Sequence, residues 1–245
     1  MKIIMIGDSF GMPNYAGPPG APPETHVEFL LKERKYDVEN LSIAASNNTT
    51  HLHQLERWIA RNPTTQIDYI LWFHNSCSHN IIIPNVPFKT NEAIEKYLKE
   101  SYKKAQLVKQ KTTAKWFVIG GGGALPDYFF QYKIHDYAIP DWKSKILKEY
   151  LPNLLPPHQR GLDVQAGATS QKMTELLTHD LNTDDKSFRK TFNSVSGSIR
   201  LKVLRQKLLF PDGGHPGIDP HRDLFLELID WFNANKFKES QQTLI

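Results

Sequence analysis

The sequence predicts a three-layer α/β fold, in which helices cover both faces of a parallel sheet of about five strands. Two observations lead to this prediction. Short apolar runs alternate along the chain with longer segments whose apolar residues have helical spacing. The apolar runs are also nearly continuous, as expected for strands that are buried on both faces.

Four apolar runs are expected to form strands. The first ends directly before Gly7, and the third (IDYILWF) is the clearest buried strand in the sequence. The four expected strands cover residues 2–6, 38–44, 67–73 and 115–119.

Helices are expected between and after these strands, where apolar residues recur at intervals of three and four. The expected helices cover residues 24–35, 49–61, 91–111 and 219–233. Residues 11–23 are rich in glycine and proline and are expected to form an irregular loop. We interpret the aromatic-rich stretch at about 124–157 as an insertion over the sheet edge. A single domain is expected over residues 1–237, with a frayed tail at 238–245.

Composition narrows the class of protein. The 245 residues carry a net charge of only +4, with no dense basic run, so nucleic-acid binding is not expected. Cys77 is the single cysteine, which excludes an internal disulfide. No stretch is apolar for long enough to predict a transmembrane helix, and no signal peptide is recognisable. A cytoplasmic protein is therefore expected.

Ser9 is the candidate nucleophile, because it directly follows the first predicted strand. Ligands of open α/β sheets bind beyond the carboxyl ends of the strands, where Ser9 is expected to lie. The alternative is a serine in an ordinary turn between a strand and a helix.

Asp212 and His215 precede the last predicted helix, with two glycines between them. A serine hydroxyl needs an adjacent base, and a carboxylate beside the histidine fixes its tautomer. This loop is therefore a candidate for both groups. The alternative is an Asp-Gly turn ahead of a helix.

Two further segments end predicted strands. Asn75 follows the third strand, where its side-chain amide could donate to an oxyanion, or could simply end the strand. Residues 42–47 lie at the end of the second strand, and their small side chains would let a backbone N–H approach a substrate. The alternative for this segment is the N-cap region of the next helix. The glycine run 120–123 is interpreted as a loop that lines the site.

Together these segments resemble four sequence blocks of the SGNH (GDSL) hydrolases, in the family's order. Residues 7–10 (GDSF) are similar to the first block, 40–47 to the second, 73–76 (FHNS) to the third, and 212–216 (DGGHP) to the fifth. The resemblance implies a flavodoxin-like arrangement of the sheet and a serine hydrolase activity.

It also implies a role for each residue. Ser9 attacks an ester carbonyl, His215 takes its proton, and Asp212 orients His215. The oxyanion hole is formed by the backbone N–H groups of Ser9 and Ala45 and by the side chain of Asn75.

The chain departs from the family in two blocks. The second block normally has a glycine, and a match to Ser-Ile-Ser-Gly places Ala45 there, whereas a match to Gly-x-Ser-Asn places Ala44 there. In the third block, Ser76 replaces the usual aspartate and His74 precedes the asparagine. Some virus-encoded members resemble this version of the third block.

The resemblance implies hydrolysis of small O-acyl esters, such as acetylated carbohydrates, through an acyl-enzyme, with no cofactor and no metal. Two alternatives stay open: a thioesterase or lysophospholipase-type acyl hydrolase, and a binding module that has the fold without turnover. The expected partner is a small-molecule or carbohydrate ester, and the sequence assigns no oligomeric state.

Overall fold

The computed structural model describes residues 1–13, 26–75, 90–121, 123–142, 145–146 and 216–242. The chain divides into two compact units. The first comprises Met1–Met12 and Lys35–Pro152, and the second comprises Pro13–Arg34 and Asn153–Ile245. Each unit is described by itself, and a single domain over residues 1–237 stays a prediction.

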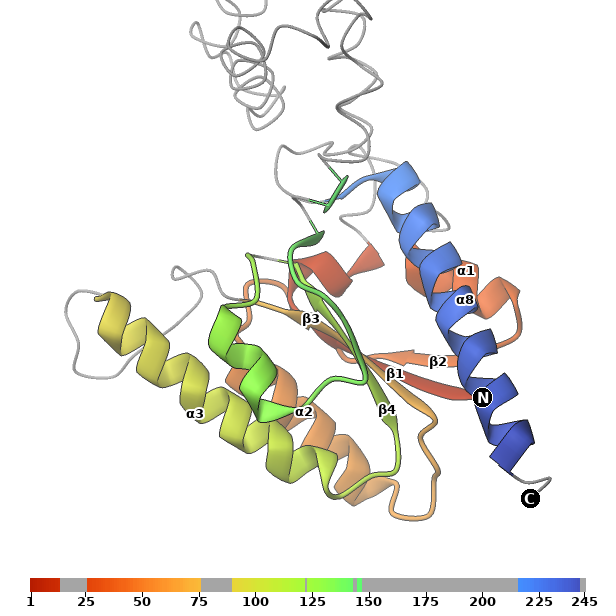
Figure 1. The fold of residues 1–245 in the computed structure, drawn as a ribbon, viewed down its shortest axis with the longest axis horizontal. Coiled ribbons are helices and arrows are strands. Elements are labelled where there is room, and N and C mark those ends of the chain that lie inside the picture. Colours follow the sequence, from red (N-terminus) through yellow and green to blue (C-terminus); the bar gives the residue numbers. More distant parts are fainter. Residues whose placement is uncertain (14–25, 76–89, 122, 143–144, 147–215, 243–245) are drawn as a thin grey trace, which may run out of the picture. The chain divides into compact units, whose positions relative to one another are not determined.

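The first unit is built on a parallel sheet of five strands, which confirms the predicted α/β fold (Figure 1). Its strands are β1 (Lys2–Gly7), β2 (Asp37–Asn40), β3 (Tyr69–His74), β4 (Lys115–Gly120) and β5 (Tyr137–Ile139). Their order is β2-β1-β3-β4-β5, and every neighbouring pair is parallel. The carboxyl ends of all five strands therefore lie along one edge of the sheet.

β1, β3 and β4 form where continuous apolar runs were predicted, and β2 is shorter than expected. All six residues of the central strand β3 are buried, as its sequence indicates. β2 ends at Asn40, earlier than expected, because the Asn40 side chain accepts from the Ser42 N–H (3.0 Å) and donates to the Gly11 carbonyl (2.7 Å). An Asx turn of this kind diverts the backbone from the strand.

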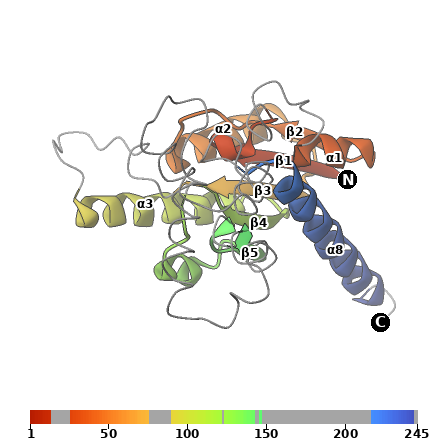
Figure 2. The ribbon, with the colours of Figure 1, turned by 90° about the horizontal axis from the view of Figure 1, so that it is seen from above.

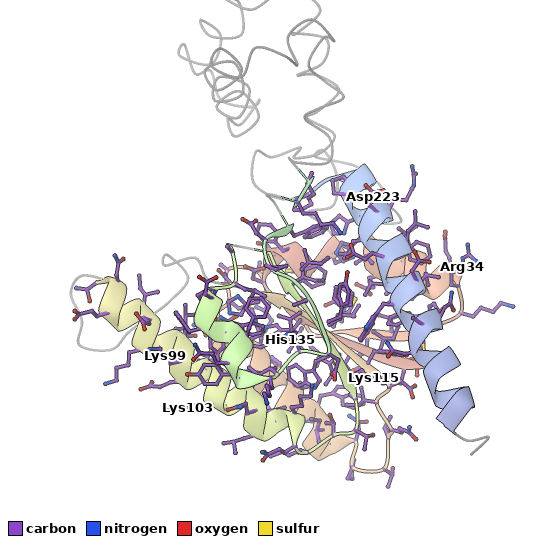
Figure 3. The ribbon with its side chains drawn as sticks, in the orientation of Figure 1. Arg34, Lys99, Lys103, Lys115, His135 and Asp223 are labelled. Carbon is purple, nitrogen blue, oxygen red and sulfur yellow. The ribbon has the colours of Figure 1, made fainter. Side chains whose placement is uncertain are left out.

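Two helices of the first unit pack on the sheet through one apolar face each (Figure 2). α2 (Asn48–Arg61) and α3 (Asn91–Lys109) lie close to the predicted bounds. Asn47 caps α2 by accepting from the Thr50 N–H, which satisfies an N–H group that the helix itself leaves unpaired. Their buried residues share one apolar cluster with β1, β3 and β4. The exposed Lys103 lies on the outer side of α3 (Figure 3).

Part of the aromatic-rich stretch contributes to this core, and its interpretation as an insertion at about 124–157 stays a prediction. Residues 137–139 form the edge strand β5, and the short 3-10 helix η5 (Asp127–Tyr132) precedes it. Phe129 and Tyr132 of η5 pack against Tyr102 of α3, with ring centroids 5.1 and 5.3 Å apart. These aromatic residues therefore pack in the core, and residues 147–157 lie outside the described part of the chain.

The second unit contains α1 (Val27–Glu33) and α8 (Ile218–Gln242). The two helices pack together, and the rings of His26 and His221 lie 4.4 Å apart between their centroids. The guanidinium of Arg34 lies over the ring of Phe225, 6.0 Å from its centroid. α8 ends at Gln242, and the frayed tail expected at 238–245 stays a prediction.

Candidate active site

Three of the predicted site residues follow three neighbouring strands at the carboxyl edge of the sheet. Ser9 follows β1, Ala45 lies in the loop after β2, and Asn75 directly follows β3. The strand order reverses between β1 and β3, because β2 lies on one side of β1 and the later strands lie on the other. Open α/β sheets bind their ligands at such a switch point. The candidate site is therefore at this edge.

Ser9 is the first residue of a short 3-10 helix, η1 (Ser9–Gly11), and is partly buried. The buried Asp8 precedes it, and its carboxylate accepts from the Phe10 N–H (3.0 Å). Gly11 is needed for close packing, because a Cβ there would lie 2.5 Å from Ser42 Oγ. These contacts fix the backbone on both sides of Ser9.

The loop after β2 is joined to the end of β1. The Ile43 N–H donates to the Gly7 carbonyl (2.9 Å), and the Ser46 hydroxyl lies 3.3 Å from the same oxygen. Between them, Ala45 has a φ of 54°, in the left-handed region that favours glycine. Ala44 is not among the described residues with positive φ. The backbone at Ala45 thus has a conformation that favours glycine over alanine.

This backbone strain predicts opposite effects for two neighbouring substitutions. Left-handed φ costs an alanine about 1–2 kcal/mol, which a glycine avoids. Glycine elsewhere costs about 0.5–1 kcal/mol in chain entropy. Ala45→Gly is therefore expected to leave the free energy of unfolding unchanged or to raise it by up to about 1 kcal/mol, whereas Ala44→Gly lowers it by about 0.5–1 kcal/mol. Urea unfolding of both variants checks this, and equal destabilisation would contradict it.

Asn75 is buried, with 2% of its surface exposed, and its side chain faces the same loop. Its Nδ2 donates to the Ser46 carbonyl at 3.3 Å, one residue beyond Ala45. The Asn75 amide, one predicted oxyanion donor, is therefore hydrogen-bonded to the loop that contains Ala45, the residue of another predicted donor. Gly121, from the glycine run predicted to line the site, lies in the same region, because a Cβ there would lie 3.1 Å from Phe10.

His51 of α2, to which the sequence assigned no role, forms a hydrogen bond with Ser46 in this loop. Trp72 Nε1 donates to His51 Nδ1 (3.2 Å), so His51 Nε2 carries the proton that it shares with Ser46 Oγ at 2.8 Å. The Ser46 hydroxyl then donates to the Ile43 carbonyl (2.6 Å). A signal for His51 was present, since helical spacing places it on the buried face of α2 with Leu55.

His74 belongs to a second buried set. Its Nε2 lies 3.0 Å from Asn48 Nδ2 and 3.0 Å from the Tyr102 hydroxyl. Burial lowers the pKa of His74 to about 3, with a smaller contribution from the charge of His51. Burial alone lowers the pKa of His51 to about 3. Both histidines are therefore neutral in the folded protein at neutral pH.

Because His51 and His74 are neutral when buried, we expect the folded protein to become less stable in acid. Their pKa in an unfolded chain is about 6.5, so below that pH the unfolded chain binds protons that the folded protein does not. As the pH is lowered from 6.5 to about 3, each histidine should lower the free energy of unfolding by about 1.4 kcal/mol per pH unit. Above pH 6.5, neither histidine should affect the free energy of unfolding.

Urea unfolding at several pH values checks the prediction. The variant His51→Gln removes one titrating group, so its stability should change less steeply with pH than that of the wild type. The matched control is His53→Gln on the same helix, because the His53 side chain is exposed. The same pH slope in all three proteins would show that His51 does not contribute to the acid destabilisation.

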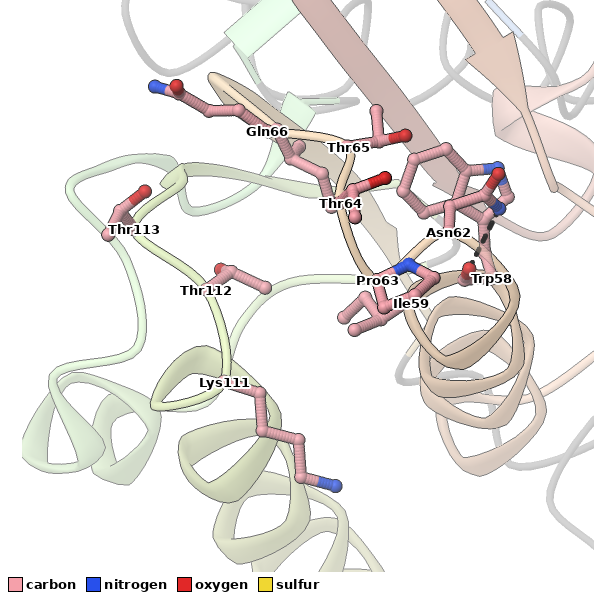
Figure 4. Close-up of a pocket in the computed structure, with 11 residues that line it drawn as sticks. Trp58, Ile59, Asn62, Pro63, Thr64, Thr65, Gln66, Lys111, Thr112 and Thr113 are labelled. Atoms are coloured by element: carbon pink, nitrogen blue, oxygen red, sulfur yellow. Dashed lines mark hydrogen bonds between the residues drawn. The ribbon is translucent and has the colours of Figure 1, made fainter.

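Asp212 and His215 lie outside the described residues, so the predicted triad stays a prediction. A cavity of about 480 Å³ lies elsewhere, where the turns before β3 and β4 meet (Figure 4). Among the described residues that line it, Lys111 is the one ionisable group, and it pairs with Glu56 at 2.9 Å. The cavity is thus at the amino edge of the sheet, opposite to Ser9.

Within the described residues, no helix is long and apolar enough to span a membrane. No group of three or more histidine, cysteine, aspartate or glutamate side chains within the same ranges is arranged to hold a metal ion.

No protein-family model and no curated protein matches the sequence. Among solved structures, the chain is similar to TesA, with 15% identity over 60% of this chain and 81% of that one, at a TM-score of 0.38. It is similar to a lipase/acylhydrolase from Enterococcus faecalis, with 13% identity over 96% of both chains and a TM-score of 0.41. It is also similar to the psychrotrophic esterase EstA from Pseudoalteromonas sp., with 14% identity over 64% and 85% of the two chains and a TM-score of 0.38. These values describe a remote similarity and assign no activity to this chain.

Proposed function

We propose that this chain is a serine hydrolase of the SGNH type, which cleaves small O-acyl esters with Ser9 as its nucleophile. The observation that carries the proposal is that three residues of the motif, Ser9, Ala45 and Asn75, follow neighbouring strands at the switch point of the sheet. Ser9 follows β1, Asn75 follows β3, and the intervening loop contacts both strand ends. The positive φ of Ala45 supports the same match, because it occurs where the motif requires glycine.

In the proposed mechanism, Ser9 Oγ attacks the carbonyl carbon of the ester while His215 takes its proton. Asp212 holds His215 in the tautomer that accepts this proton. The oxyanion is stabilised by the N–H groups of Ser9 and Ala45 and by the Asn75 amide. Collapse of the intermediate releases the alcohol, which receives the proton from His215. Water then attacks the acyl-enzyme by the same route, and the carboxylic acid leaves.

The substrate class follows from the motif, and a panel of esters tests it. We expect kcat/KM to be highest for acetyl and other short acyl groups, measured with p-nitrophenyl acetate, butyrate and dodecanoate. Acetylated xylo-oligosaccharides test the carbohydrate preference, and an acyl-CoA tests the thioesterase alternative. A preference for dodecanoate or for the thioester would refute the short-acyl assignment. No turnover of any of these would favour a binding module instead.

A further inference from the structure

The side-chain amide of Asn48, the first residue of α2, forms two hydrogen bonds with the backbone of Asn75. Asn48 Oδ1 accepts from the Asn75 N–H at 3.0 Å, and Asn48 Nδ2 donates to the Asn75 carbonyl at 2.7 Å. The Asn48 side chain is completely buried. Because a backbone N–H can only donate and a carbonyl can only accept, these two bonds fix which end of the Asn48 amide is oxygen and which is nitrogen.

The second N–H of the Asn48 amide is thereby directed at His74. Asn48 Nδ2 lies 3.0 Å from His74 Nε2, so this ring nitrogen is the one without a proton. The Tyr102 hydroxyl of α3 contacts the same nitrogen at 3.0 Å. Both donors of the Asn48 amide are satisfied, and the amide is held between Asn75 and a histidine anchored to a second helix.

We propose that Asn48 is a positioning residue for the oxyanion hole, which acts by holding Asn75 in the orientation that places its side-chain amide beside the Ala45 loop. This inference rests on the proposed function. The side-chain amide of Asn75 bonds to the Ser46 carbonyl at 3.3 Å, and the two bonds from Asn48 to the Asn75 backbone are shorter, at 3.0 and 2.7 Å.

Kinetics of single and double variants test the inference. Asn48→Ala is expected to lower kcat for p-nitrophenyl acetate about 10–100-fold with little change in KM, because a donor displaced by about 1 Å loses its effect on the transition state. Asn48→Asp has nearly the same shape and keeps an acceptor but lacks the two N–H donors, and it should be equally impaired. In an Asn75→Ala background, Asn48→Ala should cause no further loss, since it acts through Asn75.

The matched control is Asn62→Ala, which removes an amide bonded to the Trp58 carbonyl at the other end of α2 and should keep kcat unchanged. Wild-type kcat in Asn48→Asp, or losses that multiply in the double variant, would overturn the inference. Nitrogen NMR of the wild-type protein tests the hydrogen bond from Asn48 to His74 without any substitution. A proton on His74 Nε2 would also overturn the inference. Failure of the proposed function is distinguishable, because then the wild type and Ser9→Ala would have the same rate.

Discussion

Ser9→Ala is expected to reduce the hydrolysis of p-nitrophenyl acetate by a factor on the order of 10⁴–10⁶, the range seen when a member of a serine triad is removed. The reason is chemical, since alanine has no oxygen that can form the acyl-enzyme. The fold should stay intact, because the Asp8 carboxylate caps η1 by accepting from the Phe10 backbone N–H, which the substitution leaves in place.

The matched control for this variant is Ser101→Ala. Ser101 is a buried serine on α3 whose hydroxyl donates to the Tyr97 carbonyl. It should keep wild-type kcat, although it can lose some stability. If Ser9→Ala retained a substantial rate in a folded protein, Ser9 could not be the nucleophile, and another residue would have to be found.

Asn75→Ala is expected to lower kcat by a factor on the order of 10²–10³ with little change in KM, as for removal of one oxyanion donor. The Asn75 amide is proposed to bond to charge that develops only in the transition state, so substrate binding should hardly change. Steady-state kinetics on a single ester separate the two parameters. A loss confined to KM would mean that Asn75 contacts the substrate in its ground state.

The structure decides which substitution can serve as a control for Asn75. The sequence alone makes His74 look suitable, because the motif gives it no donor role. In the structure, His74 is completely buried and joined to Asn48 and Tyr102, so its removal should disturb both the core and Asn75. Asn62→Ala is the better control, because it removes a bonded amide from α2 far along the helix from Asn75.

Much of the fold could be predicted because burial on both faces produces continuous apolar runs. β1, β3 and β4 were found in this way, and α2 and α3 by their helical spacing. β5 was missed because it has only three residues, too few for any periodicity, and lies among aromatic residues. Its place in the sheet depends on pairing with β4 and not on its own sequence.

Some residues of the candidate site could be predicted from the sequence, and others could not. Ser9 and Asn75 could be predicted because each directly follows a strand with a strong apolar signal. The burial of His51 could be predicted from its helical spacing. The hydrogen bonds of Asn48 and His51 could not, because these side chains of α2 meet the loop after β2 and the end of β3 only in three dimensions. The choice between Ala44 and Ala45 depends on a single backbone angle, which the sequence does not determine.

The central claim is that Ser9 is an activated nucleophile, and labelling with a fluorophosphonate tests it most directly, because the reagent phosphonylates an activated serine hydroxyl without requiring the natural substrate. The native protein should take up one phosphonyl group, peptide mass analysis should locate it on Ser9, and folded Ser9→Ala should take up none. A folded wild-type protein that takes up no label, or that carries it on another serine, would contradict the account.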